Sequence, residues 1–216
     1  MYLATMKSIL VLGAGRSSSS LIRRLLERAV ECDWEVVVGD VDLDVAKSKV
    51  GGHERGEAFE LSSENNDERD RRISESNLVL SMVPAFLHTS VARVAIANGV
   101  PVITPSYVSP EMKALDKEAK EAGVLVLNEI GLDPGIDHMS AMKVIDEIQS
   151  DGGNLIGFES YCGGLVAPDS DDNPWHYKIS WNPRNVVLAG QGGAATFKEE
   201  GVVKVESPHR VFRKLR

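Results

Sequence analysis

The sequence predicts an α/β fold, in which a doubly wound parallel sheet is followed by part of a second, α+β domain. Three observations predict it. Short, continuously apolar runs alternate with segments of helical periodicity through the first 130 residues, which is typical of a parallel sheet covered on both faces. The first apolar run ends in a glycine-rich turn. Beyond residue 130 the alternation stops, and glycine and proline cluster in residues 131–135.

The apolar runs and the periodic segments place the elements of the first domain. Strands are expected at residues 8–12, 35–39, 58–61, 78–83, 102–104 and 124–128. Helices are expected at residues 18–30, 41–50, 67–76, 86–98 and 110–122, and Gly99 and Gly123 directly follow the last two. This order implies right-handed crossovers between parallel strands.

The rest of the chain predicts a different organisation. A helix is expected at residues 136–149, followed by strand-like pieces at 155–162, 177–180 and 186–188. We therefore expect a dinucleotide-binding domain at residues 1–130 and a substrate or dimerisation domain at residues 131–216. One helix with a few strands makes a thin second domain, so we expect the chain to be an N-terminal portion of a longer enzyme.

Composition and charge exclude several classes of function. The 216 residues carry a formal net charge of −8, and no basic stripe interrupts the acidic surface, which argues against a nucleic-acid partner. Cys32 and Cys162 form no CxxC pair, so neither a disulfide framework nor a metal site is expected. No segment has the length of a membrane span or the form of a signal peptide, and we expect a cytoplasmic protein without a membrane partner.

The turn that ends the first strand has the form of a phosphate-binding loop. A strand, the sequence Gly13-Ala-Gly15-Arg16-Ser17-Ser18 and a helix follow one another. In such turns the first glycine permits the tight bend, the second lets the backbone approach a pyrophosphate, and a small third residue allows the helix to pack closely. We predict that these five residues, Gly13 and Gly15 to Ser18, contact a dinucleotide. A plain glycine turn is the alternative.

An acidic residue follows the second strand. Asp40 stands about 20 residues past the glycine turn, where a carboxylate accepts hydrogen bonds from the adenosine ribose and repels a 2′-phosphate. The sequence therefore predicts NAD as the cofactor, with NADP as the alternative. Asp42 and Asp44 compete for the ribose role, but we interpret them as turn acids or as the cap of the next helix.

Three further strand ends should line the same crevice, because ligands of such sheets lie beyond the carboxyl ends of the strands. Ser81, Met82 and Val83 are expected along the nicotinamide half of the cofactor, and Pro84 ends that strand, with an ordinary strand exit as the alternative. Around the next strand end, residues 104–107 bring a hydroxyl and a phenol to the rim. Tyr107 is read either as a ligand contact or as a half-buried core aromatic.

The third strand end is followed by Asp133, within the run of residues 128–138. Asp133 precedes a proline and is expected to be extended, and it is read either as a site residue or as the N-cap of the next helix. His138, inside that helix, is read as a packed or surface histidine, with a proton-transfer role as the alternative.

Several stretches together resemble the L-glutamate-forming saccharopine dehydrogenase family, also called saccharopine reductases. They are Ser81-Met-Val-Pro84 with His88, Ser106-Tyr-Val-Ser-Pro110, Asn128-Glu-Ile-Gly-Leu-Asp-Pro-Gly-Ile-Asp-His138, Ser160-Tyr-Cys-Gly-Gly164, Asp172-Asn-Pro174 and Tyr177-Lys-Ile-Ser-Trp181-Asn-Pro-Arg184. The likeness covers nearly the whole chain. Val166 departs from it, since relatives commonly have proline there, and relatives are about twice as long.

The resemblance implies a reversible NAD(P)-dependent oxidoreduction of lysine metabolism. Saccharopine, oxidised cofactor and water would give 2-aminoadipate 6-semialdehyde, glutamate and reduced cofactor. The resemblance also implies a Rossmann-type domain and a homodimer. The implied site residues are Leu132 at the cofactor, Pro84, Ser106, Tyr107, Asp133 and Arg184 at the substrate, and Asp133 and Tyr107 as catalytic candidates. Arg184 would clamp a substrate carboxylate.

Two other interpretations of the sequence stay open. One is a related oxidoreductase that condenses an amine with a semialdehyde, such as a polyamine-forming enzyme, which the run of residues 161–164 argues against. The other is a non-catalytic nucleotide-binding module, which would bind the cofactor without turnover.

Overall fold

The computed structural model describes residues 6–62, 65–160, 166–174, 176–178, 195–199 and 202–206. The chain forms two compact units, residues 1–155 and 156–216, and each is treated by itself. The division into functional domains at residues 130 and 131 stays a proposal.

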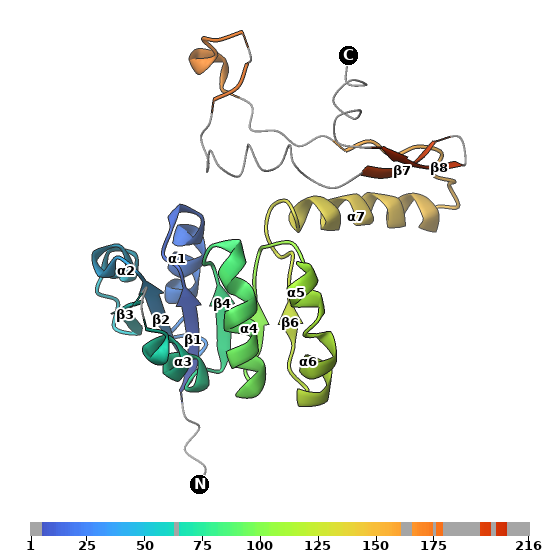
Figure 1. The fold of residues 1–216 in the computed structure, drawn as a ribbon. Coiled ribbons are helices and arrows are strands. Elements are labelled where there is room, and N and C mark those ends of the chain that lie inside the picture. The colour runs from blue at the N-terminus through green and yellow to red at the C-terminus, as the bar shows by residue number, and fades with distance from the viewer. Residues whose placement is uncertain are drawn as a thin grey trace. The chain divides into compact units, whose positions relative to one another are not determined.

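The first unit contains a six-stranded parallel sheet (Figure 1). Its strands, in the order β3-β2-β1-β4-β5-β6, are β3 (Gly56–Glu60), β2 (Trp34–Asp40), β1 (Lys7–Leu12), β4 (Leu78–Ser81), β5 (Val102–Ile103) and β6 (Val126–Leu127). The chain builds outward from β1 to β3, then starts again at β4 on the other side of β1. This is the doubly wound Rossmann order, whose ligand crevice lies between β1 and the strand at which the order reverses. The predicted fold class is confirmed.

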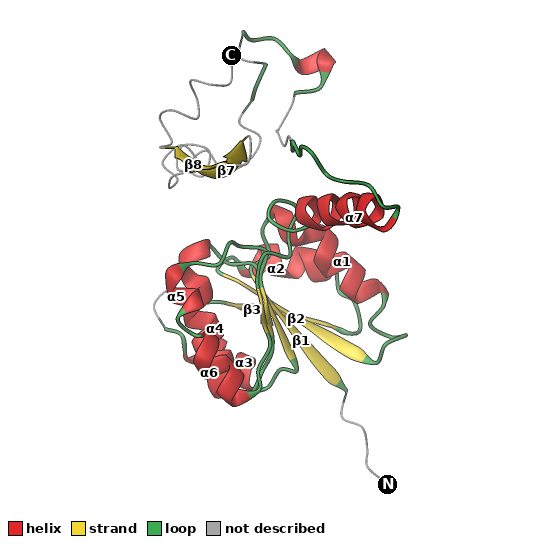
Figure 2. Ribbon diagram, turned by 90° about the vertical axis from the view of Figure 1, so that its right-hand side faces the viewer, coloured by secondary structure: helices red, strands yellow, loops and turns green. Residues whose placement is uncertain are grey.

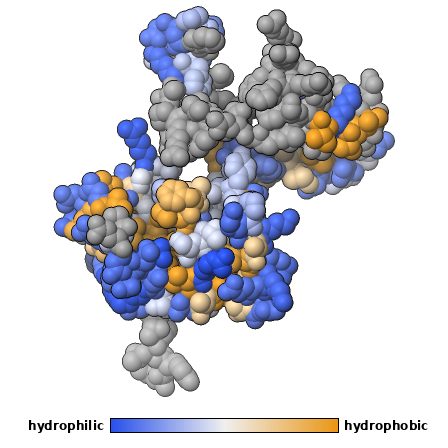
Figure 3. Space-filling view, viewed as in Figure 1, coloured by the Kyte–Doolittle hydropathy of each residue, from blue (hydrophilic) through white to orange (hydrophobic). Residues whose placement is uncertain are grey.

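Helices cover both faces of this sheet (Figure 2). α1 (Ser19–Glu27) and α2 (Leu43–Val50) lie on one face, while α3 (Asp67–Ser74), α4 (His88–Ala97), α5 (Pro110–Lys113) and α6 (Asp116–Ala122) lie on the other. α7 (Ile136–Ser150) follows, and none of its residues is buried. On the face shown in Figure 3, hydrophilic residues cover much of the region over the charged helix α3.

The core follows from the period of two along β1. Ile9 and Val11 pack with Ile22 of α1 on one face, and Leu10 and Leu12 pack on the other face with residues of α3 and α4. All five side chains are buried, four of them fully. Because both faces of the strand are covered, β1 reads as a continuous apolar run, as the sequence analysis assumed.

Several observed elements are shorter than the sequence predicted. The helix expected at residues 18–30 begins as a 3₁₀ turn, η1 (Arg16–Ser18), and the one expected at 86–98 begins as η2 (Ala85–Leu87). The helix expected at 110–122 divides into α5 and α6, because the Leu115 amide donates to the Met112 carbonyl, a tighter bond than the α-helical one.

The second unit corrects two expectations. The described residues of the predicted strand 155–162, residues 155–160, form no strand. Instead, an antiparallel hairpin joins β7 (Ala195–Glu199) to β8 (Val202–Glu206), with Glu199 opposite Val202. This hairpin was not predicted from the sequence, although Gly201 between two runs of strand-forming residues was a signal for it. A 3₁₀ turn, η3, spans Pro168–Ser170. The predicted strand 186–188, and residues 179–180 of the strand 177–180, lie outside the described residues.

Candidate functional site

The glycine turn sits at the carboxyl end of β1, and Gly13 is required there by packing. Its φ is +103°, and a Cβ at this position would lie 2.7 Å from the Met82 carbonyl oxygen. Its amide also donates to the Gly39 carbonyl at 2.7 Å. Gly13 is therefore hydrogen-bonded to the end of β2 and packed closely against the backbone that follows β4. These contacts within the protein explain the glycine without any ligand.

Gly15 differs, because the protein leaves open space beside it. A Cβ there would meet no atom within 4 Å, and its φ of −62° suits any residue. Arg16 and Ser17 are exposed, whereas Ser18 is fully buried and its hydroxyl donates to the Gly15 carbonyl at 2.8 Å. The buried small residue matches the close packing expected at the third position of the turn. The open side of Gly15 is where such turns admit a pyrophosphate.

Asp40 reaches back from β2 to this turn. Its Oδ2 accepts a hydrogen bond from the Ala14 amide at 2.6 Å, and its Oδ1 accepts one from the Asp42 amide at 3.1 Å. The side chain is half-buried, so its charge lies at the edge of the turn.

Asp42 has a different partner. Its carboxylate accepts from the amides of Asp44 and Val45, at 3.0 and 3.2 Å, and so caps α2. Asp44 is exposed in the first turn of that helix. The local geometry therefore agrees with the interpretation of these two acids as a cap and a surface residue.

The ends of β4 and β5 are joined through a buried histidine. The Ser81 hydroxyl lies 2.8 Å from Nδ1 of His88, and the Ser106 hydroxyl lies 2.8 Å from Nε2. The Thr104 hydroxyl is 3.2 Å from the same Nε2. Burial lowers the pKa of His88 to about 4, so the ring is neutral at pH 7. His88 was quoted only as part of the family resemblance, and its link to two predicted site residues was missed.

The two predicted catalytic residues lie in contact. The Tyr107 hydroxyl donates to Oδ1 of Asp133 at 2.9 Å, although 26 positions separate them in the chain. Tyr107 is 65% exposed, so its interpretation as a half-buried core aromatic is wrong. The loss of some hydration at the phenol, and then the Asp133 carboxylate, raise the pKa of Tyr107. The phenol is therefore held as a neutral donor. Asp133 is not the cap of α7, so that alternative is wrong: Gly135 stands at the cap position, and its amide donates to Asp137.

Glu129 holds the two loops that carry this pair. Its carboxylate accepts from the Val108 amide at 3.1 Å, and its own amide donates to the Ser106 carbonyl at 3.1 Å. Glu129 has a φ of +62°, an uncommon conformation for a residue with a side chain. The hydrogen bonds to the neighbouring loop give a physical reason for keeping it. The sequence analysis did not single out Glu129.

The remaining predicted residues are less constrained. Met82 and Val83 are half-buried, while Pro84 precedes η2, and Leu132 is 71% exposed. His138 is exposed on α7 and pairs with the neighbouring Asp137 at 2.8 Å, in agreement with a surface histidine. Arg184 lies outside the described residues.

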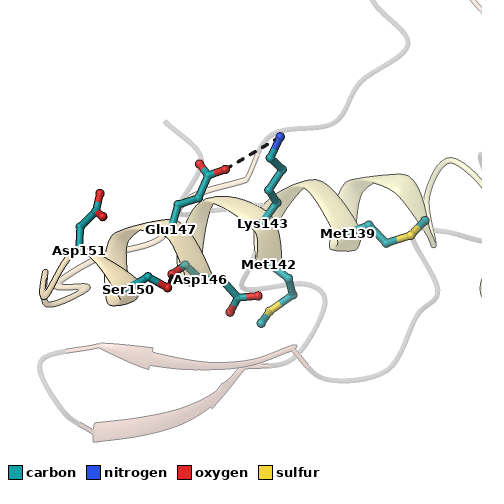
Figure 4. Close-up of a pocket in the computed structure, with 7 residues that line it drawn as sticks. All are labelled: Met139, Met142, Lys143, Asp146, Glu147, Ser150 and Asp151. Atoms are coloured by element: carbon teal, nitrogen blue, oxygen red, sulfur yellow. Dashed lines mark hydrogen bonds and ion pairs between the residues drawn. The ribbon is translucent and has the colours of Figure 1, made fainter.

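A pocket of about 630 Å³ runs along α7, away from these strand ends (Figure 4). Among the described residues it is lined by Met139, Met142, Lys143, Asp146, Glu147, Ser150 and Asp151. Lys143 Nζ and Glu147 Oε1 lie 3.9 Å apart there, and none of these described lining residues belongs to the glycine turn or to a strand end of the parallel sheet. We therefore place the candidate site at the sheet edge.

Within the described ranges there is neither a helix suited to crossing a membrane nor a group of three metal-ligating side chains.

Comparison with known proteins gives a consistent family. Residues 9–127 match the model of the saccharopine dehydrogenase NADP binding domain, and residues 131–216 match that of the saccharopine dehydrogenase C-terminal domain. The saccharopine dehydrogenase [NADP(+), L-glutamate-forming] of Pyricularia oryzae is 41% identical over 94% of this chain and 44% of its own length. The mitochondrial alpha-aminoadipic semialdehyde synthase of Bos taurus is 37% identical over 86% of this chain and 20% of its own.

A solved structure agrees with these matches. The apo saccharopine dehydrogenase (L-Glu forming) of Saccharomyces cerevisiae superposes with a TM-score of 0.80 at 37% identity, over 94% of this chain and 44% of its own. The chain thus spans less than half the length of the relatives it matches.

Proposed function

This chain belongs to the saccharopine dehydrogenase family, and on that ground we propose that it carries the cofactor site and part of the substrate site of a reversible oxidoreduction. The substrate is saccharopine, and the bond that reacts is a C–N bond. The observation that carries the proposal is the pairing of Tyr107 with Asp133 at the sheet edge that also holds the glycine turn.

The reaction assigns a task to each group. The glycine turn and Asp40 would hold the dinucleotide, which when bound would supply a hydride acceptor for the carbon beside the secondary amine of saccharopine. Water then adds to the C=N bond of the substrate, and the adduct breaks down to 2-aminoadipate 6-semialdehyde and glutamate. Protons must leave the amine and the water. Asp133 is the acceptor we assign to them, since it is the carboxylate that the Tyr107 hydroxyl orients.

The substrate carries several carboxylates, which bind most strongly to charge-assisted hydrogen-bond donors. The one proton of the Tyr107 hydroxyl goes to Asp133, so Ser106 provides the donor hydroxyl for a substrate carboxylate, and Arg184 is our proposed cationic clamp. The raised pKa of Tyr107 supports its role as a neutral hydrogen-bond donor rather than a base.

The cofactor is a nicotinamide dinucleotide, and we propose that this chain prefers NAD. The names of several curated relatives state NADP(+). Asp40 opposes that choice here, because its carboxylate lies at the glycine turn, where it accepts from the Ala14 amide and where we expect the adenosine ribose to bind. A 2′-phosphate would lie against this charge. A homodimer and a cytoplasmic location stay predictions from the sequence.

Two assays test the proposal. Binding of NADH and NADPH is followed by nicotinamide fluorescence, and turnover is followed by the absorbance of reduced cofactor when saccharopine is supplied with NAD or NADP. Turnover of saccharopine supports the complete proposal. Cofactor binding without turnover by the protein that contains this chain would favour a nucleotide-binding module. Turnover of an amine and semialdehyde pair other than the products of saccharopine would favour a polyamine-forming enzyme.

A further inference from the structure

His88 connects two strand ends that the proposed reaction uses. It is the first residue of α4, it is 3% exposed, and both ring nitrogens lie within hydrogen-bond distance of hydroxyl groups. Ser81 belongs to β4 and Ser106 follows β5. A neutral imidazole has one N–H donor and one acceptor nitrogen, so the ring gives the two hydroxyls opposite roles.

The environment of Ser81 decides which nitrogen is the acceptor. Ser81 is fully buried, and in the described part of the chain its hydroxyl has Nδ1 of His88 as its one side-chain partner, at 2.8 Å. If Nδ1 carried the proton, the Ser81 O–H would be a buried donor without an acceptor. Buried donors are left unpaired less often than the second lone pair of an oxygen. The Ser81 hydroxyl therefore donates to Nδ1.

The Thr104 hydroxyl is the competing donor to this ring. It is also buried, and donation to Nε2 would demand the opposite tautomer. Its distance of 3.2 Å is longer than the 2.8 Å of Ser81, so Ser81 has the stronger bond to an acceptor nitrogen. With the proton on Nε2, the Thr104 oxygen is an acceptor, a role it already has toward the Ser106 amide at 3.3 Å.

The consequence reaches Ser106. With the proton on Nε2, the ring donates to the Ser106 oxygen at 2.8 Å, and the Ser106 proton is left without a role in this network. Ser106 is half-buried, beside the Tyr107–Asp133 pair. Its O–H is then available to the crevice only as a donor.

We propose that His88 is a positioning residue, which Ser81 holds in the Nε2–H form so that the Ser106 hydroxyl donates to a carboxylate of the substrate. The identity of that carboxylate ligand rests on the proposed function. His88 itself touches neither the cofactor nor the substrate. Its effect is to set the direction of one hydrogen bond in a site that must bind an anionic amino acid.

The tautomer can be measured without any ligand. Long-range ¹H–¹⁵N correlation at neutral pH distinguishes the protonated from the unprotonated ring nitrogen, and the signals lost in His88→Gln assign the residue. A protonated Nε2 supports the proposal. A protonated Nδ1, or averaging between the two forms, overturns it, because Ser106 would then donate to the ring or have no fixed direction.

Two variants separate positioning from packing. The amide nitrogen of His88→Gln can lie near the Nε2 position and donate to Ser106, whereas the shorter His88→Asn reaches the Nδ1 position only. We expect saccharopine binding, measured with cofactor present, to be about tenfold weaker in His88→Asn and to be largely restored in His88→Gln. Thermal unfolding of both variants serves as the control for folding.

Equal binding by His88→Asn and the parent protein would overturn the proposal. If the parent protein bound the cofactor but no saccharopine, the proposed substrate would be wrong. The tautomer measurement would still decide the role of His88.

Discussion

Replacing Asp40 by asparagine tests the cofactor preference most directly. The substitution keeps the shape of the side chain and one acceptor oxygen for the Ala14 amide, which now lies 2.6 Å from Oδ2. It removes the negative charge that we expect to face the 2′ position of the adenosine ribose. We predict that Asp40→Asn loses affinity for NADH and gains affinity for NADPH.

The size of the effect follows from Coulomb's law. Two unit charges about 4 Å apart interact by about 1 kcal/mol in water and about 4 kcal/mol at an effective dielectric constant of about 20. Asp40 is half-buried, so the interaction lies between these limits. A change of about 1–3 kcal/mol in the preference corresponds to roughly 5- to 150-fold in the ratio of the two dissociation constants.

The assay is a paired fluorescence titration with NADH and NADPH. Asp44→Asn is the matched control, because it removes the same charge from an exposed position in the first turn of α2. The ratio of the two dissociation constants should change in Asp40→Asn and stay constant in Asp44→Asn. The change in Asp40→Asn should be smaller in high salt. An unchanged ratio in Asp40→Asn would refute the ribose role, and an equal change in both variants would point to net charge alone.

Three further outcomes are expected. Gly15→Val should fold, because a Cβ there meets no protein atom within 4 Å, yet it should lose cofactor binding. Tight binding by a folded Gly15→Val would contradict the phosphate-loop interpretation. Gly13→Ala should instead lower the melting temperature, because its Cβ would lie 2.7 Å from a backbone oxygen. Asp42→Ala should cost about 1 kcal/mol of unfolding free energy, measured with urea, through the lost cap of α2, without altering the cofactor ratio. The Tyr107 phenol should titrate above its ordinary pKa in an ultraviolet absorbance titration, and Asp133→Asn should lower that pKa. Because the pKa of Tyr107 is higher in the folded protein, the neutral phenol contributes to the free energy of unfolding. This contribution is complete below about pH 10, the ordinary pKa of tyrosine, and is lost as the pH rises through the pKa of the folded protein.

The sequence by itself determined the features that depend on neighbouring residues. The apolar run of β1, the Gly13 turn and the cap at Asp42 each follow from burial or backbone conformation within a few positions. The carboxylate of Asp40 could also be placed, because the end of the second strand of such a fold always lies beside the first turn. The alternation of strands and helices was sufficient for the doubly wound sheet.

The tertiary structure alone decided which strand ends meet. The Tyr107–Asp133 and Ser81–His88–Ser106 contacts join residues whose separation depends on the order β1-β4-β5-β6, and no local pattern specifies it. Asp133 illustrates the difference: its sequence context suits a helix cap, but the chain turns once more and places the cap at Gly135. The spacing of apolar residues along the sequence predicts which side chains are buried, whereas the geometry of a site depends on how distant strands pack in the sheet.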